Sequence, residues 1–284
     1  MSTSSAFVKK LASNDRPTRE AALESLKRFL SSKSSKKLSE LDLSKLWKGL
    51  YYSMWFCDRP RAQERLAEQL GSLFSDCISR DQFCSFVSSF WVIMISEWPN
   101  VDQWRVDKYY LLIRRVLRHN FKMLKLNNWD EELVKNWLEV LEKEGGVLSG
   151  DKKIAYALPY HICDIYLDEL ELIIFEELKG DQEVLENYKK DDKEYIELYE
   201  SLFKRKLQIV EDIPIKQLIS PFEHLNKDAL LKTLREKCAD EVLNDERLKD
   251  WGVVEDDESD SEEDGEADSA SEDEDESEDE WKGF

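Results

Sequence analysis

Basic side chains gather along one stretch of this sequence in a pattern that suits a binding role. They are Lys108, Arg115, Arg118, Lys122 and Lys125. When residues 102–127 are wound as a helix at about 100° per residue, these side chains occupy one sector of about 100°. Apolar residues take the opposite side, and no acidic residue falls within the basic sector. The pattern predicts either an ordinary solvated face or a surface for RNA phosphate or an acidic partner.

Three further arginines surround a predicted helix corner at Pro60 and could extend the basic surface. They are Arg59, Arg61 and Arg65. Just before the corner, the rings of Tyr52 and Trp55 lie off the main apolar stripe of the preceding helix. These rings are expected either to stack on bases or to pack against a neighbouring helix.

No recognisable catalytic or metal-binding pattern accompanies these residues. The histidines, His119, His161 and His224, lie far apart, and the zinc-protease, paired-cysteine, calcium-loop, phosphate-loop and nucleophile-elbow patterns are absent. Asp164 and Asp168 lie one helical turn apart, and we expect them on a solvated or salt-bridged face rather than around a metal. The sequence therefore predicts a protein that is not an enzyme and that needs no metal or cofactor.

Helices must position these residues, and helical periodicity runs along nearly the whole chain. The predicted helices are 15–31, 40–56, 59–78, 81–97, 102–127, 130–144, 152–178, 182–210 and 226–249. Pro159 is expected to kink or split its helix, and Pro214 and Pro221 to mark turns. No segment has a convincing strand pattern. Antiparallel helices in pairs spaced by about 40 residues predict an all-α, HEAT-like or armadillo-like helical-repeat stack.

Charge divides the chain into parts. The net charge of −21 comes mostly from residues 255–280, which hold eighteen Asp and Glu and no Lys or Arg. Residues 1–128 carry +9 and residues 129–254 carry −13. The predicted parts are a helical body at 1–250, with a basic half at 1–128 and an acidic half at 129–250, and a tail at 251–284. A basic half suits phosphate or an acidic partner, whereas an acidic half suits a basic ribosomal or nucleolar protein.

The composition of the tail predicts disorder. From Glu255 on, large apolar residues are absent until Trp281 and Phe284, so the segment cannot bury enough surface to offset its ordering entropy. Five serines have an acidic residue three positions later, which favours acid-directed phosphorylation. They are Ser259, Ser261, Ser269, Ser271 and Ser277. The alternative is a tail that only keeps the protein in solution.

The remaining composition predicts an intracellular protein without a membrane segment. The five cysteines are scattered and odd in number, as expected of reduced core residues. The polar residues after Met1 lack the apolar region of a secretory signal. The longest uncharged run, residues 82–96, has 15 residues, short of the roughly 20 needed to cross a bilayer.

Several segments combine residues in a way that is unusual for chance. They read LWKGLYYSMWFCDRP at 46–60, Phe90-Trp91, Glu97-Trp98, RVDKYYLLIRR at 105–115 and YHICDIYLDEL at 160–170. Together they resemble the ribosomal RNA-processing protein 1 family of nucleolar proteins. The resemblance covers about 7–225, and the compact length resembles a fungal member. Pro159 departs from the family, in which we expect a Gly-containing turn.

This resemblance implies a helical-repeat protein of the nucleus and nucleolus. It further implies association with early precursors of the large (60S) ribosomal subunit, their assembly factors and ribosomal proteins, and precursor rRNA whose processing depends on it. It implies no active site, so no catalytic residue is transferred. The tail beyond residue 250 lies outside the resemblance.

Three kinds of function remain open. The first is a scaffold that docks on precursor particles, with the basic stripe touching RNA or protein. The second is a nucleic-acid-processing enzyme, against which the absent metal and phosphate motifs stand. The third is a helical-repeat adaptor or chaperone for basic ribosomal proteins. The resemblance and the missing motifs favour the scaffold.

Overall fold

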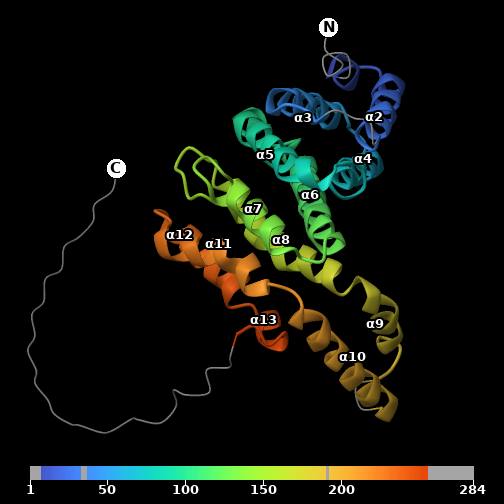
Figure 1. Ribbon diagram of the computed structural model, residues 1–284, viewed down its shortest axis with the longest axis vertical. Helices are drawn as coiled ribbons and strands as arrows, with labels where there is room; N and C mark the ends of the chain where they lie inside the picture. The colour runs from blue at the N-terminus through green and yellow to red at the C-terminus, as the bar shows by residue number, and fades with distance from the viewer. Residues whose placement is uncertain (1–7, 33–36, 190–191, 255–284) are drawn as a thin grey trace, which may run out of the picture. The chain divides into compact units, whose positions relative to one another are not determined.

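The computed structural model describes residues 8–32, 37–189 and 192–254, which form helices joined by short turns (Figure 1). The α-helices are α2 (Arg16–Leu30), α3 (Glu40–Trp55), α4 (Pro60–Ser72), α5 (Arg80–Glu97), α6 (Val106–Leu126), α7 (Glu131–Glu142), α8 (Ala157–Ile174), α9 (Lys179–Leu185), α10 (Lys193–Glu211), α11 (Ile215–Asp228), α12 (Lys232–Cys238) and α13 (Glu246–Asp250). Shorter helical segments of different pitch are η1 (Leu73–Cys77), η2 (Trp98–Asn100), η3 (Glu176–Leu178) and η4 (Ala239–Leu243). These residues contain no strand, and the all-α prediction is confirmed. None of the described helices is long and apolar enough to cross a membrane.

The predicted tail lies almost entirely outside the described residues. This applies to Ser259, Ser261, Ser269, Ser271 and Ser277, and to Trp281 and Phe284. Residues 251–254, which the charge pattern assigned to the tail, are described and pack on the helices. Trp251 and Val253 are buried, and the Trp251 ring meets Phe175 edge-on at 5.7 Å. The packed body therefore continues to Val254.

Local signals in the sequence define where helices begin. The Asp15 carboxylate accepts a hydrogen bond from the Thr18 backbone N–H at 2.9 Å, and the Ser39 hydroxyl accepts one from the Asp42 N–H at 3.2 Å. Both bonds satisfy N–H groups that have no partner inside the helix. Pro60 starts α4, where a missing N–H leaves no hydrogen bond unmade.

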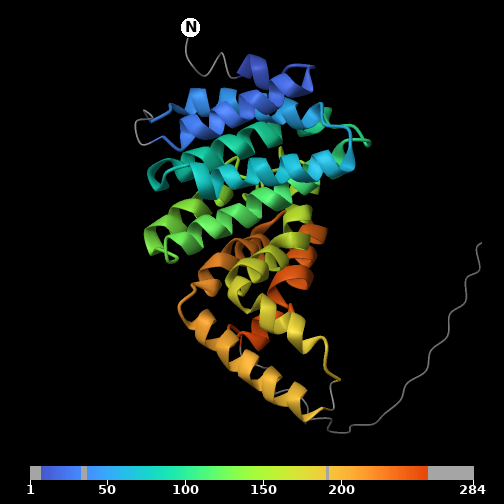
Figure 2. The ribbon, with the colours of Figure 1, turned by 90° about the vertical axis from the view of Figure 1, so that its right-hand side faces the viewer.

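The helices stack in two layers. In the first layer α3, α5 and α7 pack in succession, and in the second α4, α6 and α8 do so (Figures 1 and 2). Ion pairs show that α4 and α6 run in the same direction, because Asp58 lies beside Lys108 and Glu68 beside Arg115. Successive helix pairs with parallel neighbours form the HEAT-like stack that the sequence predicted.

Aromatic side chains join the layers near the N-terminal end. The buried Trp47 ring lies 5.4 Å from Phe74 and 4.9 Å from Phe90 between ring centroids. Tyr51 stacks on Tyr109 at 4.6 Å, and the Tyr109 hydroxyl donates to the Tyr51 carbonyl at 3.0 Å. Such ring pairs contribute about 0.5–1.5 kcal/mol each beyond the area they bury. They connect α3 with α5, η1 and α6.

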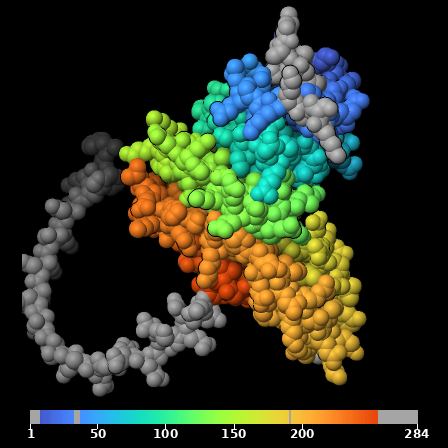
Figure 3. All heavy atoms as spheres, in the orientation of Figure 1, coloured from blue at the N-terminus to red at the C-terminus, as the bar shows by residue number. Residues whose placement is uncertain are grey.

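Helices α9 and α10 interrupt the stack. Beyond α8, the second layer continues with α12 and η4, and beyond α7 the first layer continues with α11. The chain thus inserts α9 and α10 between α8 and α11, and they lie side by side beyond α8 and α13 (Figures 1 and 3). Arg205 and Asp181 form an ion pair between the two inserted helices. Of α10, only Leu202 and Val210 are buried.

The predictions about two prolines were wrong. Pro159 lies in the first turn of α8, where the backbone N–H groups have no helical partner, so it neither kinks nor splits the helix. Pro221 lies inside α11 rather than in a turn. The carbonyl that proline leaves unpaired is that of Gln217, and the Ser220 hydroxyl donates to it at 2.9 Å. A neighbouring serine thus satisfies the group that the proline frees.

Two predicted helix boundaries also need correction. The segment 182–210 is not one helix, because α9 ends at Leu185 and α10 begins at Lys193. The segment 226–249 is divided among the end of α11, α12, η4 and α13. The first predicted helices, from 15–31 to 130–144, agree with α2 to α7 within a few residues at each end, apart from η1, which extends α4.

Candidate functional site

The turn between α3 and α4, residues 55–61, is held in place by a buried lysine of α6. The Lys108 ammonium donates to the Trp55 carbonyl at 2.7 Å and the Cys57 carbonyl at 3.0 Å, and lies 3.7 Å from the Asp58 carboxylate. Carbonyls at a helix end lack helical partners, so Lys108 caps α3. Burial lowers the pKa of Lys108, and Asp58 partly opposes this. We call residues 55–65, which run from the end of α3 through the turn into α4, the α3–α4 corner.

Cations lie over the aromatic rings at this corner. The Arg105 guanidinium sits 4.4 Å from the Trp55 ring centroid, and the Lys48 ammonium 5.6 Å from that of Tyr52. Both rings are half-buried and also lie near Tyr51. Trp55 thus packs against Arg105, the residue that precedes α6, whereas the ring contacts of Tyr52 are with residues of its own helix and its C-cap.

One tryptophan beside the corner points into solvent. Trp104 is 84% exposed, in the turn that precedes α6. Its backbone N–H donates to the Asp102 carboxylate at 3.0 Å, and Asp102 also pairs with Arg105. Since Arg105 covers Trp55, this turn lies against the α3–α4 corner. The sequence analysis missed Trp104, although a tryptophan just outside a helix and off its apolar face was the available signal.

The three predicted arginines of the corner are exposed. They are Arg59, Arg61 and Arg65. Among the described residues none of them has a recorded ion-pair partner. Arg59 and Arg65 line a groove of about 720 Å³ between α2 and α4, together with Arg16, Arg19, Glu20 and others. Arg19 is already bound there, because its guanidinium donates to the Phe56 carbonyl at 3.1 Å.

The basic stripe of α6 does not form the open surface that its periodicity predicted. Lys108 is only 4% exposed. Arg115 lies 3.3 Å from the Glu68 carboxylate of α4, and Lys125 donates to the Ile173 carbonyl of α8 at 2.8 Å. The physical reason is that α4 and α8 cover α6 from both sides. Their carboxylates and carbonyls therefore occupy most of the stripe.

Arg118 and Lys122 complete the stripe in different ways. Arg118 pairs with Glu169, which is fully buried, with a second contact at 3.1 Å to the same carboxylate. Arg114 binds Glu169 from the preceding turn of α6. Lys122 is half-buried and has no recorded ion pair in the described part of the chain. The Glu169 cluster therefore joins α6 to α8.

Asp164 and Asp168, one turn apart on α8, are paired with basic residues. Asp164 pairs with Lys237 of α12, and Asp168 lies 3.0 Å from Arg114 and 3.1 Å from Arg247. Within the described residues, no group of three or more His, Cys, Asp or Glu is placed to hold a metal ion. These carboxylates connect successive helices of the second layer.

The histidines lie apart in the structure as well. His119 is buried between the Ser75 hydroxyl at 2.8 Å and the Glu68 carboxylate at 2.9 Å. The His161 ring contacts the Tyr110 carbonyl at 3.0 Å. Burial lowers the pKa of both imidazoles. His119 and His161 therefore fill packing positions between neighbouring helices, whereas the exposed His224 lies 2.6 Å from the Glu142 carboxylate.

A comparison with known protein families identifies the family of this chain. Residues 2–284 match the family described as "Nucleolar protein, Nop52". The chain belongs to the Nop52 family. This membership confirms the family resemblance and the nucleolar localisation inferred from the sequence.

Relatives in animals carry a common name. Human Ribosomal RNA processing protein 1 homolog B is 39% identical over 179 residues, which cover 62% of this chain and 23% of the human protein. The mouse homolog B is 37% identical over 179 residues, 62% of this chain and 24% of the mouse protein. The Caenorhabditis elegans homolog is 35% identical over 217 residues, 73% of this chain and 54% of the nematode protein. The match thus spans about a quarter of the mammalian relatives and about half of the nematode relative.

Proposed function

We propose that this Nop52-family protein is a non-catalytic assembly factor of the large (60S) ribosomal subunit precursor. It holds assembly factors, ribosomal proteins and precursor rRNA in position so that processing enzymes can act on the RNA. The names of its relatives supply the link to rRNA processing. The observation that carries the proposal is a helical stack with exposed arginines at the α3–α4 corner that have no ion-pair partner among the described residues.

The RNA contact is assigned to the α3–α4 corner rather than to the α6 stripe. Arg59, Arg61 and Arg65 are exposed and lack recorded ion-pair partners in the described chain, so their charge is available for phosphate. Trp104, in a turn fixed by Asp102, offers a ring face on which a base can stack. Arginine beside an exposed aromatic ring is a combination that single-stranded RNA sites use.

The non-catalytic role rests on how the polar residues are used. The buried Glu169, Lys108 and His119 each bind groups on neighbouring helices, so their chemistry is used in holding the stack. Burial in packed positions likewise lowers the pKa of His161 and raises the pKa of Tyr51. A scaffold needs such cross-links between helices, because a rigid surface fixes the geometry of what it binds.

The test is sedimentation of tagged protein from cells at moderate salt, with analysis of the co-migrating RNA and proteins. We expect co-migration with large-subunit precursor RNA and assembly factors. The triple variant Arg59→Glu, Arg61→Glu, Arg65→Glu is expected to leave these fractions while keeping its unfolding midpoint, because all three side chains are exposed. Unchanged co-migration of the triple variant would reject the corner as the contact.

A matched control separates the position of charge from its amount. Lys135→Glu, Lys153→Glu and Lys227→Glu together make the same change in net charge on exposed residues of α7, of the turn before α8 and of α11. We expect this control to remain with the particles. Equal release of both triple variants would show that net charge, and not the corner, governs association.

The charge distribution favours one alternative, an adaptor or chaperone for basic ribosomal proteins. Residues 129–254 carry −13, and a basic protein could bind this half without RNA. In that case the tagged protein would sediment alone or with free ribosomal proteins, and ribonuclease treatment would not change its position. Co-migration that is lost after ribonuclease treatment supports the scaffold instead.

A further inference from the structure

The inserted helix α10 carries an apolar face that the body leaves uncovered. Ile196, Tyr199, Phe203 and Leu207 recur at spacings of three, four and four residues and so lie along one side of the helix. Ile196 is 48%, Tyr199 50% and Phe203 38% exposed. A surface helix of a folded domain normally turns such a face toward the core. We call these four residues the α10 apolar face.

The α10 apolar face is preorganised. The rings of Tyr195, Tyr199 and Phe203 stack along the helix, with centroids 6.1 and 6.4 Å apart. Each ring restricts the rotamers of the next, so ordering these side chains on binding costs little entropy. Large aromatic rings of this kind supply much of the energy in protein interfaces.

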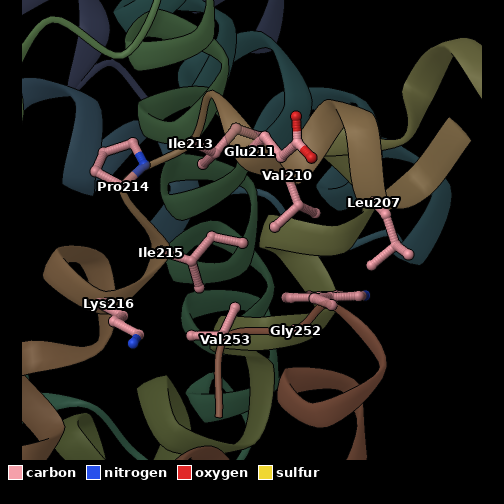
Figure 4. Close-up of a pocket in the computed structure, with 10 residues that line it drawn as sticks. Leu207, Val210, Glu211, Ile213, Pro214, Ile215, Lys216, Gly252 and Val253 are labelled. Atoms are coloured by element: carbon pink, nitrogen blue, oxygen red, sulfur yellow. The ribbon is translucent and has the colours of Figure 1, made fainter. Parts of the chain in front are cut away.

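The face continues into two hollows. Beside Tyr199 and Phe203 lies a hollow of about 170 Å³, closed by Leu185 and Trp251. Where α10 ends, Leu207 lines a second hollow of about 490 Å³ together with Val210, Ile215, Val253 and others (Figure 4). Figure 4 shows these aliphatic side chains arranged around the hollow. The apolar strip therefore runs along most of α10 and has depressions at its side and its end.

Charge around the α10 apolar face indicates the partner. Glu197 and Glu200 flank the face on one side, and Glu171 and Asp250 rim the smaller hollow on the other. Lys206 and Arg247, which also line that hollow, are paired with Glu171. Lys204 is an exposed cation on the Glu200 side. Lys193 pairs with Glu197, so the charges beside the face are nearly balanced. Residues 176–212, the stretch that contains both inserted helices, nevertheless hold twelve Asp and Glu against seven Lys and Arg, so the insert as a whole favours a cationic partner.

We propose that the α10 apolar face docks an amphipathic helix of another protein, whose apolar side is flanked by Lys and Arg. The spacing of the four residues matches the helix-in-groove mode, in which one apolar stripe meets another. The chain's own terminal Trp281 and Phe284 fit poorly, because the eighteen carboxylates before them would be repelled by the acidic surroundings. This docking site lies on the inserted helices and is separate from the arginine corner of the proposed function.

The test is photo-crosslinking from the full-length protein bound to precursor particles. Benzoylphenylalanine replaces Ile196 in one variant and Ser201 in a control. Ser201 is exposed on the opposite side of α10, about 140° away from Ile196. Mass spectrometry then identifies the crosslinked peptide. We expect a crosslink from position 196 to a basic amphipathic helical segment of a protein, at least about tenfold stronger than any from position 201.

A second variant ties the crosslink to the α10 apolar face. Tyr199→Ser with Phe203→Ser, placed in the position-196 protein, is expected to weaken the crosslink about tenfold or more, because both rings are interface anchors. Both side chains are partly covered, so circular dichroism at the temperature of the crosslink is used to check that the variant keeps the helical content of the parent protein. Crosslinks to rRNA, to residues 281–284 or to a second copy of the chain would overturn the proposal, as would equal yields from positions 196 and 201.

Discussion

At the scale of single residues, Lys108 is the side chain whose removal should be felt most at the α3–α4 corner. Lys108→Met keeps most of the volume but removes the ammonium that donates to the Trp55 and Cys57 carbonyls. The Cys57 carbonyl still accepts from the Gln63 side chain at 2.8 Å, so the main loss is at the Trp55 carbonyl. Losing a partner for buried carbonyls costs about 1–3 kcal/mol. We expect the free energy of unfolding, measured by urea titration, to fall by this amount.

Lys122→Met is the matched control for that change. Lys122 lies on the same helix and has no recorded ion pair within the described chain, so its replacement should change stability by no more than about 0.5 kcal/mol. Equal effects of the two substitutions would show that Lys108 does not cap α3. The difference between the two changes in unfolding free energy measures how much the cap stabilises the protein.

Protonation of His119 should make stability depend on pH. Burial lowers the pKa of His119, an effect that Glu68 only partly opposes, so the folded protein binds this proton less readily than the unfolded chain does. In the unfolded chain the pKa of histidine is about 6.5. The stabilisation that the neutral His119 ring provides is complete above that pH and is lost as the pH falls below it. Urea titrations give the free energy of unfolding at pH 7.5 and at pH 5.5. Between these two pH values it should fall less for His119→Gln than for the parent protein. His161 is present in both proteins, so identical losses would contradict a role for His119.

The sequence predicted residue types better than residue roles. The helical wheel correctly put Lys108, Arg115 and Arg118 on the side of α6 opposite its apolar stripe. It could not show that α4 and α8 would supply Glu68 and Glu169 to that side, because these partners are about 50 residues away in the chain. Arg59 is exposed in the turn before α4, and Arg61 and Arg65 are exposed on α4 itself.

At the scale of helices, the packing of α4 on α6 depends on a missing side chain. A Cβ at Gly71 would lie 2.8 Å from the Arg115 carbonyl oxygen and from the His119 ring. Gly71→Ala must therefore push the helices apart or strain them, at a cost of about 1–3 kcal/mol. Thermal unfolding should show a lower midpoint for this variant.

Gly180 provides the opposite case on α9. A Cβ there meets nothing within 4 Å, and alanine favours the helical state over glycine by about 0.5–1 kcal/mol. Gly180→Ala should leave the midpoint unchanged or raise it. If both alanines lower it equally, general helix effects rather than the α4–α6 approach would be responsible.

Helix periodicity predicted the first six long helices because each has an apolar stripe along it. Helices α2, α3 and α7 also begin with a capping side chain, and α4 begins with a proline. It failed at Pro221, since the sequence gives no sign that the Ser220 hydroxyl satisfies the Gln217 carbonyl inside α11. It also joined α9 to α10, because charged and aromatic residues continue through the turn between Leu185 and Lys193. A break without glycine or proline leaves little trace in a helical pattern.

At the scale of the whole body, ion pairs connect the second layer from helix to helix. Glu68 links α4 to α6, Glu169 links α6 to α8, and Asp164 links α8 to α12. The polarity of the sequence, basic before residue 128 and acidic after it, thus partly reflects the pairing of basic α6 with acidic α8. Among the described residues, two charged regions lie outside these ion pairs. They are the exposed arginines of the α3–α4 corner and the acidic stretch that contains α10. The two proposed contacts lie in these two regions.

The same architecture predicts an uneven distribution of local stability. Helix α6 is covered on both sides, whereas α10 has only Leu202 and Val210 buried, and most of the stability of a helix in a protein comes from packing against its neighbours. In hydrogen exchange on the free protein, amides of residues 196–201 should be protected at least about 100-fold less than those of 112–121. This ratio corresponds to an opening free energy that is lower by about 2.7 kcal/mol. Particle-bound protein should regain protection in 196–201, because a docked helix covers Ile196 and Tyr199. If the amides of α10 and α6 are equally protected in the free protein, the body alone stabilises the insert. If protection of residues 196–201 does not increase on the particle, the apolar face has no partner there.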